Sequence, residues 1–228
     1  MSVKPTPHAV LMIGIGGIGH AFLRALQDHR PSHLTLVDGD TVSAHNLSRQ
    51  PLFSQADIGM LKVEVARAAL ARSMPGTRLD TRPIFADRYN LPSLINGFSL
   101  VIDCTDDAHA KCAIDQACLE AGTPLISAAV HADQAQVMLL HASGAMGDPA
   151  ITRGHLFSGQ LGPGQDDCDM RAVPLEVLTT VGNRMAVLWD DLRSARDVMN
   201  GRVELLYGER WTMIAPPDRR ATAWTRPY

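Results

Sequence analysis

The chain has 228 residues, 46% of them hydrophobic and 20% charged, which is enough apolar material for a sizeable core and excludes a disordered chain. Its formal net charge of -3 at pH 7 argues against a protein that binds nucleic acid through a basic surface. No run of 18 apolar residues and no signal-peptide pattern is present, so we expect a cytoplasmic protein with no membrane partner. The four cysteines show no C-x-x-C spacing, which predicts neither a disulfide framework nor a structural zinc site.

The first half of the chain alternates between apolar runs and helical patterns. An apolar run over 8–13 leads into a glycine-rich turn and a helical pattern over 20–27, and a second apolar run covers 33–37. An amphipathic helix is predicted over 57–73. Further strands are predicted over 78–84, 99–104, 124–127 and 134–141, and a further helix over 108–121. Strands that alternate with helices predict an α/β fold, with a Rossmann-like, largely parallel sheet and helices on both faces.

The sequence changes character past residue 141. Six glycines between residues 142 and 172 predict a long loop. A helical pattern then covers 173–198, with a kink expected near Gly182, and short strands are expected over 202–206 and 211–214. The predicted organisation is a core over 1–141, a Gly-rich crossover-type loop over 142–172, and a less regular C-terminal extension over 173–228 whose helix and strands complete the same domain.

Four glycines mark the turn after the first predicted strand: Gly14, Gly16, Gly17 and Gly19, spaced G-x-G-G-x-G. Glycines let the backbone bend sharply and approach a phosphate closely, and the N-terminus of the following helix offers free N–H groups. Asp38 closes the next strand, where its carboxylate can accept hydrogen bonds from a ribose. NAD, FAD and ATP all fit this pattern, so the turn predicts a nucleotide site and no particular nucleotide.

Charged residues farther along the chain favour a triphosphate over NAD. Arg49 and Lys62 follow the second strand, where loops can return them to the glycine turn, and two cations suit the charge of a triphosphate. Asp106 follows a buried strand at its carboxyl end, and a carboxylate beside a polyphosphate implies a bound Mg²⁺. The alternative interpretation is that both cations are solvated surface groups and that Asp106 is a helix N-cap.

Five motifs occur in order between about residues 9 and 140: G-x-G-G-x-G, D-x-D-x-V, N-L-x-R-Q, D-I-G-x-x-K and D-C-T-D. Together they resemble the adenylation domain of the ThiF/MoeB/HesA family of adenylyltransferases, the prokaryotic relatives of ubiquitin-activating enzymes. The resemblance implies a transferase that uses ATP and Mg²⁺ to adenylate the C-terminal carboxylate of a small β-grasp protein, a ubiquitin-like or sulfur-carrier protein, or of a peptide with a Gly-Gly-like tail. Pyrophosphate is released, and the family implies a homodimer.

The resemblance also implies roles for individual residues. Arg49 and Lys62 would stabilise phosphate charge, Asp38 would hold the ribose, and Asp106 would hold Mg²⁺ with Asp107 as an auxiliary. The residues implied to bind the nucleotide are Gly14, Gly16, Gly17, Gly19, Asp38, Asp40, Asn46, Arg49, Gln50, Lys62, Asp106 and Asp107. With the family assigned, residues 1–141 are the expected nucleotide-binding adenylation core.

Cys168 is the fourth candidate catalytic residue. In sulfur-carrier-activating relatives, a cysteine shortly before the returning helix can form a covalent link to the carrier, and a thiolate suits attack on an acyl-adenylate. Three neighbouring aspartates would raise the pKa of this thiol, and the family sequence after the cysteine is largely absent. The family's N-terminal helix, which supplies an arginine to the triphosphate, is also absent, so that contact would have to come from Lys111 or Arg24, or be lost.

Three other functions are also compatible with the sequence. The chain could be a nucleotide-binding pseudo-enzyme or scaffold of the same family, because the N-terminal arginine helix is missing. It could instead activate a tRNA base or a small molecule with ATP, although no basic stripe favours tRNA. An NAD-dependent oxidoreductase is the least favoured, because the pattern from Asn46 to Lys62 would then have no function.

Overall fold

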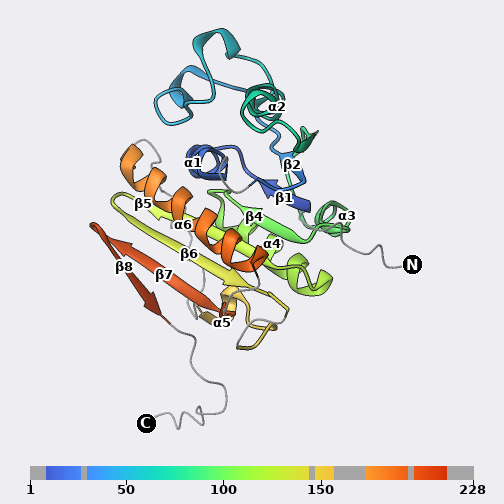
Figure 1. The fold of residues 1–228 in the computed structure, drawn as a ribbon, viewed down its shortest axis with the longest axis vertical. Coiled ribbons are helices and arrows are strands. Elements are labelled where there is room, and N and C mark those ends of the chain that lie inside the picture. Colours follow the sequence, from blue (N-terminus) through green and yellow to red (C-terminus); the bar gives the residue numbers. More distant parts are fainter. Residues whose placement is uncertain (1–8, 27–29, 144–146, 157–172, 195–197, 215–228) are drawn as a thin grey trace.

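The computed structural model describes residues 9–26, 30–143, 147–156, 173–194 and 198–214. The strands are β1 (Ala9–Ile13), β2 (His33–Val37), β3 (Arg78–Arg82), β4 (Leu100–Asp103), β5 (Leu125–His131), β6 (Gln134–Leu140), β7 (Arg202–Tyr207) and β8 (Arg210–Ile214). Within the described residues they form one sheet in the order β3-β2-β1-β4-β5-β6-β7-β8 (Figure 1). The strands from β3 to β5 run parallel and the remaining pairs antiparallel, which confirms the predicted α/β fold with a largely parallel sheet.

Helices cover both faces of this sheet (Figure 1). The α-helices are α1 (Gly17–Ala25), α2 (Lys62–Ser73), α3 (Leu91–Ile95), α4 (Ala108–Ala121), α5 (Arg153–Leu156) and α6 (Leu175–Arg193), and two short 3-10 helices are η2 (Ala44–Asn46) and η3 (Gln55–Asp57). Side chains of α1, α2 and α6 belong to one buried cluster, and those of α3 and α4 belong to a second. The two clusters lie on opposite faces of the sheet.

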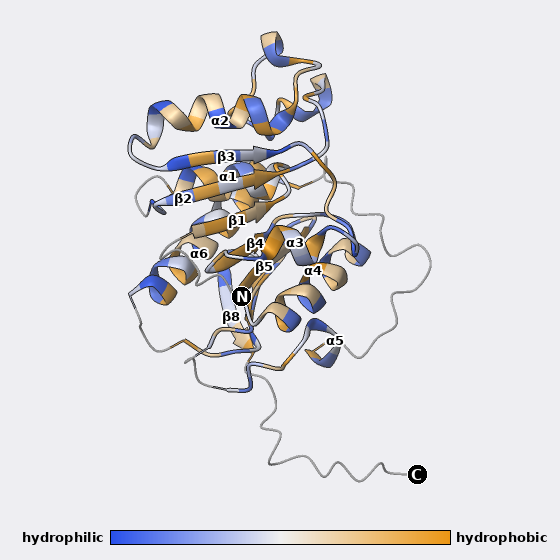
Figure 2. Cartoon of the chain, turned by 90° about the vertical axis from the view of Figure 1, so that its right-hand side faces the viewer, coloured by the Kyte–Doolittle hydropathy of each residue, from blue (hydrophilic) through white to orange (hydrophobic). Residues whose placement is uncertain are grey.

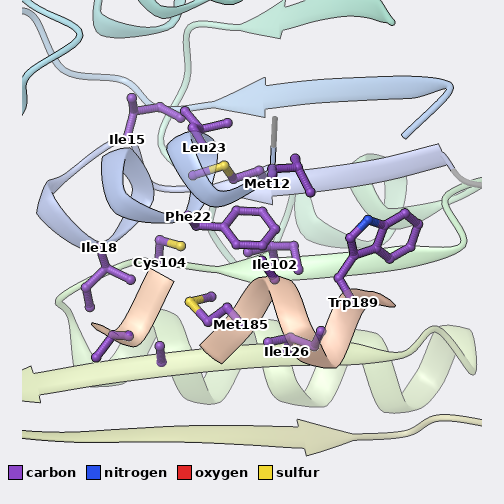
Figure 3. Packing of buried hydrophobic residues seen from close by; sticks show 14 of the residues in the cluster. Met12, Ile15, Ile18, Phe22, Leu23, Ile102, Cys104, Ile126, Met185 and Trp189 are labelled. Atoms are coloured by element: carbon purple, nitrogen blue, oxygen red, sulfur yellow. The ribbon is translucent and has the colours of Figure 1, made fainter. Parts of the chain in front are cut away.

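Strand β1 shows why the centre of the sheet is apolar without interruption. Its alternate residues Val10 and Met12 belong to the first cluster, whereas Leu11 and Ile13 belong to the second. A parallel strand with helices on both faces buries every side chain, so its sequence is a continuous hydrophobic run. Figure 2 shows the hydrophobic central strands between helices that carry both hydrophobic and hydrophilic residues, and Figure 3 shows Met12 packed near Phe22 of α1.

The predicted helix over 57–73 is wrong at its start, because α2 begins at Lys62. Residues 57–61 close a loop instead: the N–H of Val42 donates to the carbonyl of Met60 at 2.8 Å, and Gly59 has a φ of +88°, outside the helical region. Backbone pairing with the segment after β2 therefore overrides the helical pattern.

Helices α1 and α6 pack against each other across the first cluster, with Phe22 and Met185 among their buried side chains (Figure 3). Gly182 lies at the point of closest approach, since an added Cβ would sit 2.4 Å from the backbone carbon of Ala21. Helix α6 continues through Gly182 without a break. The glycine therefore serves close helix packing.

The C-terminal elements extend the same sheet. β6 pairs with β5 over seven residue pairs from Leu125–Leu140 to His131–Gln134, so β5 is longer than the predicted 124–127. The carboxylate of Glu204 on β7 is buried and pairs with Arg184 on α6, which ties this helix to the added strands. No helix in the described ranges combines the length and the apolar character needed to cross a membrane.

Replacing Gly182 with alanine is expected to destabilise the fold. The new Cβ would clash with backbone, and overpacking of this kind costs about 1–3 kcal/mol of the free energy of unfolding. The matched control is Gly154→Ala in α5, where the Cβ would meet only the Thr152 hydroxyl at 3.7 Å. Thermal unfolding should show a melting temperature for Gly182→Ala about 2–10 °C below that of the control. Equal melting temperatures would refute the packing role of Gly182.

Candidate nucleotide site

A cavity of about 1000 Å³ lies at the carboxyl ends of β1, β2 and β4. The chain leaves β1 toward β2 on one side, and β4 joins β1 on the other, so this is the point where the strand order reverses. Ligands in open α/β sheets bind at such a switch point. The predicted site residues that line the cavity are Gly14, Gly16, Gly17, Asp38, Asp40, Asn46, Arg49, Gln50, Lys62, Asp106 and Asp107.

Glycine stands at three positions of the turn for three different structural reasons. Gly14 has a φ of +93°, and an added Cβ would lie 2.8 Å from the carbonyl of Cys104. A Cβ on Gly19 would lie 2.5 Å from the Gly14 oxygen, so Gly19 allows tight packing and is absent from the cavity lining. A Cβ on Gly16 would meet no atom within 4 Å, which leaves open space at the N-terminus of α1. The turn therefore offers free N–H groups to an anion in the cavity.

Asp38 connects the second strand to the glycine turn. Its Oδ2 accepts a hydrogen bond from the N–H of Ile15 at 2.6 Å, and its Oδ1 accepts one from the N–H of Asp40 at 2.8 Å. Each carboxylate oxygen can accept a further hydrogen bond. The residue is therefore fixed by the backbone and still able to accept hydrogen bonds from ribose hydroxyls.

The loop between β2 and α2 carries Arg49 and Gln50 to the cavity. Asn46 anchors this loop by accepting hydrogen bonds from the N–H and the hydroxyl of Ser43, at 3.2 and 2.6 Å. Among the described residues, the buried Nη1 of Arg49 and the buried Oε1 of Gln50 have no hydrogen-bond partner. A buried polar group without a partner is costly, and for a guanidinium the matching partner is an anion. The Arg49 nitrogen therefore fits a bound polyphosphate, whereas the Gln50 oxygen can only accept a hydrogen bond and needs a donor.

Lys62 is the first residue of α2, and its side chain is only 8% exposed. Its Nζ lies 2.8 Å from Oδ2 of Asp40, which is 53% exposed. Lys62 thus adds a second cation to the wall of the cavity that Arg49 also lines.

Asp106 and Asp107 have separate positions at the start of α4. Asp107 is the helix N-cap, because its Oδ1 accepts a hydrogen bond from the N–H of Ala110 at 2.6 Å. The alternative interpretation of Asp106 as the cap is therefore wrong. Asp106 is exposed in the cavity wall, and no described residue makes a hydrogen bond or ion pair with its carboxylate.

One carboxylate at this position fits magnesium better than a metal that needs an all-protein site. Within the described residues, no group of three or more His, Cys, Asp or Glu side chains could hold a metal ion. Mg²⁺ usually takes one or two carboxylates and completes its shell with phosphate oxygens and water. Asp106 is the residue that would supply such a ligand, and the metal would neutralise charge on the phosphates.

A buried ion pair supports the loop that carries Asp106. The Nζ of Lys111 lies 3.0 Å from Oδ2 of Asp103 and donates to the carbonyl of Ala128 at 2.6 Å. Burial raises the pKa of the Asp103 carboxyl, but Lys111 and the hydroxyls of Ser127 and Thr105 together lower it below its ordinary value. Lys111 is thus committed to Asp103, which contradicts its suggested role in contacting the triphosphate.

His20 is a buried residue beside the site that sequence reasoning missed. Its Nδ1 donates to the carbonyl of Gly16 at 2.8 Å, and its ring meets that of Phe53 edge to face at 4.4 Å. Burial lowers the pKa of His20, the Gly16 hydrogen bond raises it and the charge of Lys62 lowers it, and together they bring it from 6.5 to about 4. A neutral imidazole thus joins α1 to the Arg49 loop. An isolated histidine within a helical pattern gave no signal of this contact.

The other predicted residue, Cys168, lies outside the described residues. Sequence reasoning also missed Phe85 and His109, which line the cavity from the segment after β3 and from α4. Neither belongs to a sequence motif, and only the folded chain brings them to the cavity.

Comparisons with known proteins agree with this geometry. The ThiF family matches residues 6–188 of the chain. A molybdopterin-synthase adenylyltransferase of Salmonella typhimurium is 43% identical over 128 residues, which are 56% of this chain and 51% of that protein. An adenylyltransferase and sulfurtransferase MOCS3 of Drosophila grimshawi is 35% identical over 119 residues, 52% of this chain and 26% of that protein. The chain spans about half the length of the bacterial relatives it matches.

Solved structures share the fold over almost the whole chain. Escherichia coli MccB superposes with a TM-score of 0.79 at 18% identity, covering 95% of this chain and 64% of that one. A structure of MccB with ATP superposes with a TM-score of 0.77 at 17% identity, covering 95% of this chain and 66% of that one. These likenesses confirm the Rossmann-like fold.

The buried state of His20 predicts a pH dependence of stability. Since its pKa is near 6.5 when unfolded and about 4 when folded, the unfolded chain binds the extra proton first as the pH falls. Stability should therefore decrease between pH 6.5 and 4, by at most about 3 kcal/mol from this residue. His141 has a raised pKa, although its burial opposes the shift, and acts in the opposite direction.

The contribution of His20 is isolated by comparing the wild type with His20→Asn, which retains a donor for the Gly16 carbonyl and does not titrate. Urea unfolding at pH 7 and pH 5 should show a smaller loss of stability for the variant. An identical loss in both proteins would show that His20 titrates normally.

Proposed function

The chain belongs to the ThiF family, and from this premise we propose that it is an adenylyltransferase. It would use ATP to adenylate the C-terminal carboxylate of a small β-grasp carrier protein, or of a peptide with a Gly-Gly-like tail. The observation that carries the proposal is the buried Nη1 of Arg49, which has no partner among the described residues and belongs to a side chain that lines the cavity with Lys62. A triphosphate matches these two cations, whereas the single pyrophosphate of NAD does not.

The reaction joins a carboxylate to AMP. An oxygen of the substrate carboxylate attacks the α-phosphorus of ATP, the bond from that phosphorus to the bridging oxygen of pyrophosphate breaks, and an acyl-adenylate forms. The N–H groups at the start of α1 would bind phosphate oxygens, and Asp38 would hold the ribose. Arg49 and Lys62 would stabilise the charge that moves onto the leaving pyrophosphate. Positioned charges of this kind supply most of the catalysis in such transfers.

Asp106 would hold Mg²⁺ at the start of α4, and Asp107, as the helix cap, would keep the segment in place. The bound ion would neutralise phosphate charge and orient the phosphates. Asp106 belongs to the wall on the β4 side of the cavity, whereas Arg49 and Lys62 follow β2. The phosphates would therefore lie between an anionic and a cationic wall, with the metal on the anionic side.

The class of partner is proposed from the matched relatives. The matched proteins include a molybdopterin-synthase adenylyltransferase, and the chain spans about half its length. A β-grasp carrier or a peptide would place its flexible tail in the cavity next to the α-phosphate. Cys168 as a covalent acceptor, the homodimer and the cytoplasmic location stay predictions.

The first test is thermal unfolding in the presence of MgATP, NAD⁺ or NADH. Each ligand is added at about 5 mM, which is roughly a hundredfold above a dissociation constant of about 50 μM. MgATP at that excess adds about 2.7 kcal/mol and should raise the melting temperature by about 5–10 °C. Asp106→Ala and Arg49→Ala should lose most of this shift, and Arg72→Ala, an exposed arginine in the last turn of α2, should retain it. A shift with NAD⁺ or NADH alone would overturn the proposal.

The second test measures chemistry. ATP–pyrophosphate exchange, with a synthetic peptide ending in Gly-Gly as the carboxylate, should be detectable for the wild type. Lys62→Ala should lower the exchange rate by about a hundredfold, since one positioned charge contributes about 3 kcal/mol to the transition state. If MgATP binds but neither this peptide nor purified β-grasp carriers support exchange, the chain is a nucleotide-binding scaffold.

A further inference from the structure

The carboxylate of Asp40 faces Lys62, although Asp40 was expected to contact the nucleotide. The Nζ of Lys62 donates a hydrogen bond to its Oδ2 at 2.8 Å. The lysine side chain is 8% exposed and the aspartate side chain 53% exposed. No other described residue makes a hydrogen bond or ion pair with the Lys62 ammonium group. The pair therefore joins a nearly buried cation to a hydrated anion in the cavity wall.

The backbone fixes both partners of this pair. The N–H of Lys62 donates to the carbonyl of Asp40 at 3.0 Å, and Thr41 and Leu61 form an antiparallel bridge directly beside them. The N–H of Asp40 donates to Asp38, which in turn accepts from the N–H of Ile15 in the glycine turn. A continuous chain of hydrogen bonds thus runs from the phosphate-binding turn to the ammonium group of Lys62.

Lysine needs such a holder more than arginine does. Its ammonium group is a point charge on a long flexible stem, so its position depends on a partner. A buried ammonium group also needs a counter-charge, because its hydration has been lost. Asp40 supplies both, and its half-exposed carboxylate can remain hydrated while it does so.

We propose that Asp40 is a positioning residue that holds the Lys62 ammonium group at the cavity wall, ready to meet a phosphate, and that Asp40 makes no direct contact with the nucleotide. This inference rests on the proposed function, since Lys62 is the group through which Asp40 acts. A carboxylate beside a phosphate would repel it without an intervening cation, and here Lys62 is that cation. The phosphate would share the ammonium group with Asp40, because an ammonium group has three N–H donors.

A double-mutant cycle tests the inference through MgATP binding measured by calorimetry. Lys62→Ala should weaken binding about 10–100-fold, and Asp40→Ala about 3–10-fold, because the lysine remains but is no longer held. In the Lys62→Ala background, Asp40→Ala should cause no further loss, and a small gain would reflect the removed repulsion. Glu120→Ala, which removes one exposed carboxylate at the far end of α4, should bind MgATP as the wild type does.

Two outcomes of the double-mutant cycle would contradict a positioning role for Asp40 or the proposed function. If Asp40→Ala costs the same factor in both backgrounds, Asp40 contacts the nucleotide or its metal directly and is no positioning residue. If the wild type itself does not bind MgATP, the proposed function fails, and a measurement without nucleotide then decides the role of Asp40.

That measurement is the rate at which acetic anhydride acetylates Lys62, followed by mass spectrometry. The chain contains only three lysines, Lys4, Lys62 and Lys111, so each site is readily assigned. Lys62 should react several-fold faster in Asp40→Ala than in the wild type, while the rate at Lys111, buried against Asp103, stays unchanged. An unchanged Lys62 rate would overturn the holding role, whatever nucleotide the protein binds.

Discussion

The close approach between the glycine turn and the segment after β4 is the constraint on which the site depends. The N–H of Cys104 donates to the carbonyl of Ile13 at 2.8 Å, and the N–H of Gly14 donates to the carbonyl of Val37 at 2.9 Å. These bonds bring three strand ends to one edge, and a side chain at Gly14 would collide with the Cys104 carbonyl. Only a glycine turn lets α1 begin where its free N–H groups face the cavity.

Two cations near this edge differ in whether their buried charge has a partner within the described residues. Lys111 is 4% exposed and forms an ion pair with Asp103, which is fully buried, so its charge is already neutralised inside the protein. Arg49 retains a buried nitrogen without a described partner. A paired cation stabilises the framework, whereas an unpaired buried cation can still gain free energy by binding an anion of a ligand. Lys62 lies between these cases, because its partner Asp40 is itself half in water.

Sequence periodicity was most reliable where burial is complete. The apolar runs of β1, β2 and β4 correspond closely to the predicted strands, because both faces of these strands are covered. Periodicity failed at residues 57–61, where pairing of the loop ends replaces helix. It also gave no sign that Gly182 packs against α1, because that helix is some 160 residues away in sequence.

The sequence by itself determined the α/β fold, the family and the polar motif residues at the cavity, since motif order and hydrophobic runs are local properties of the chain. Only the tertiary structure decided which partner each of these charged residues has. It separated Asp106 from the capping Asp107, removed Lys111 from the phosphate site, and turned Asp40 toward Lys62. The physical reason is that the pairing of a charge depends on which neighbours share its burial, and those neighbours come from distant parts of the chain.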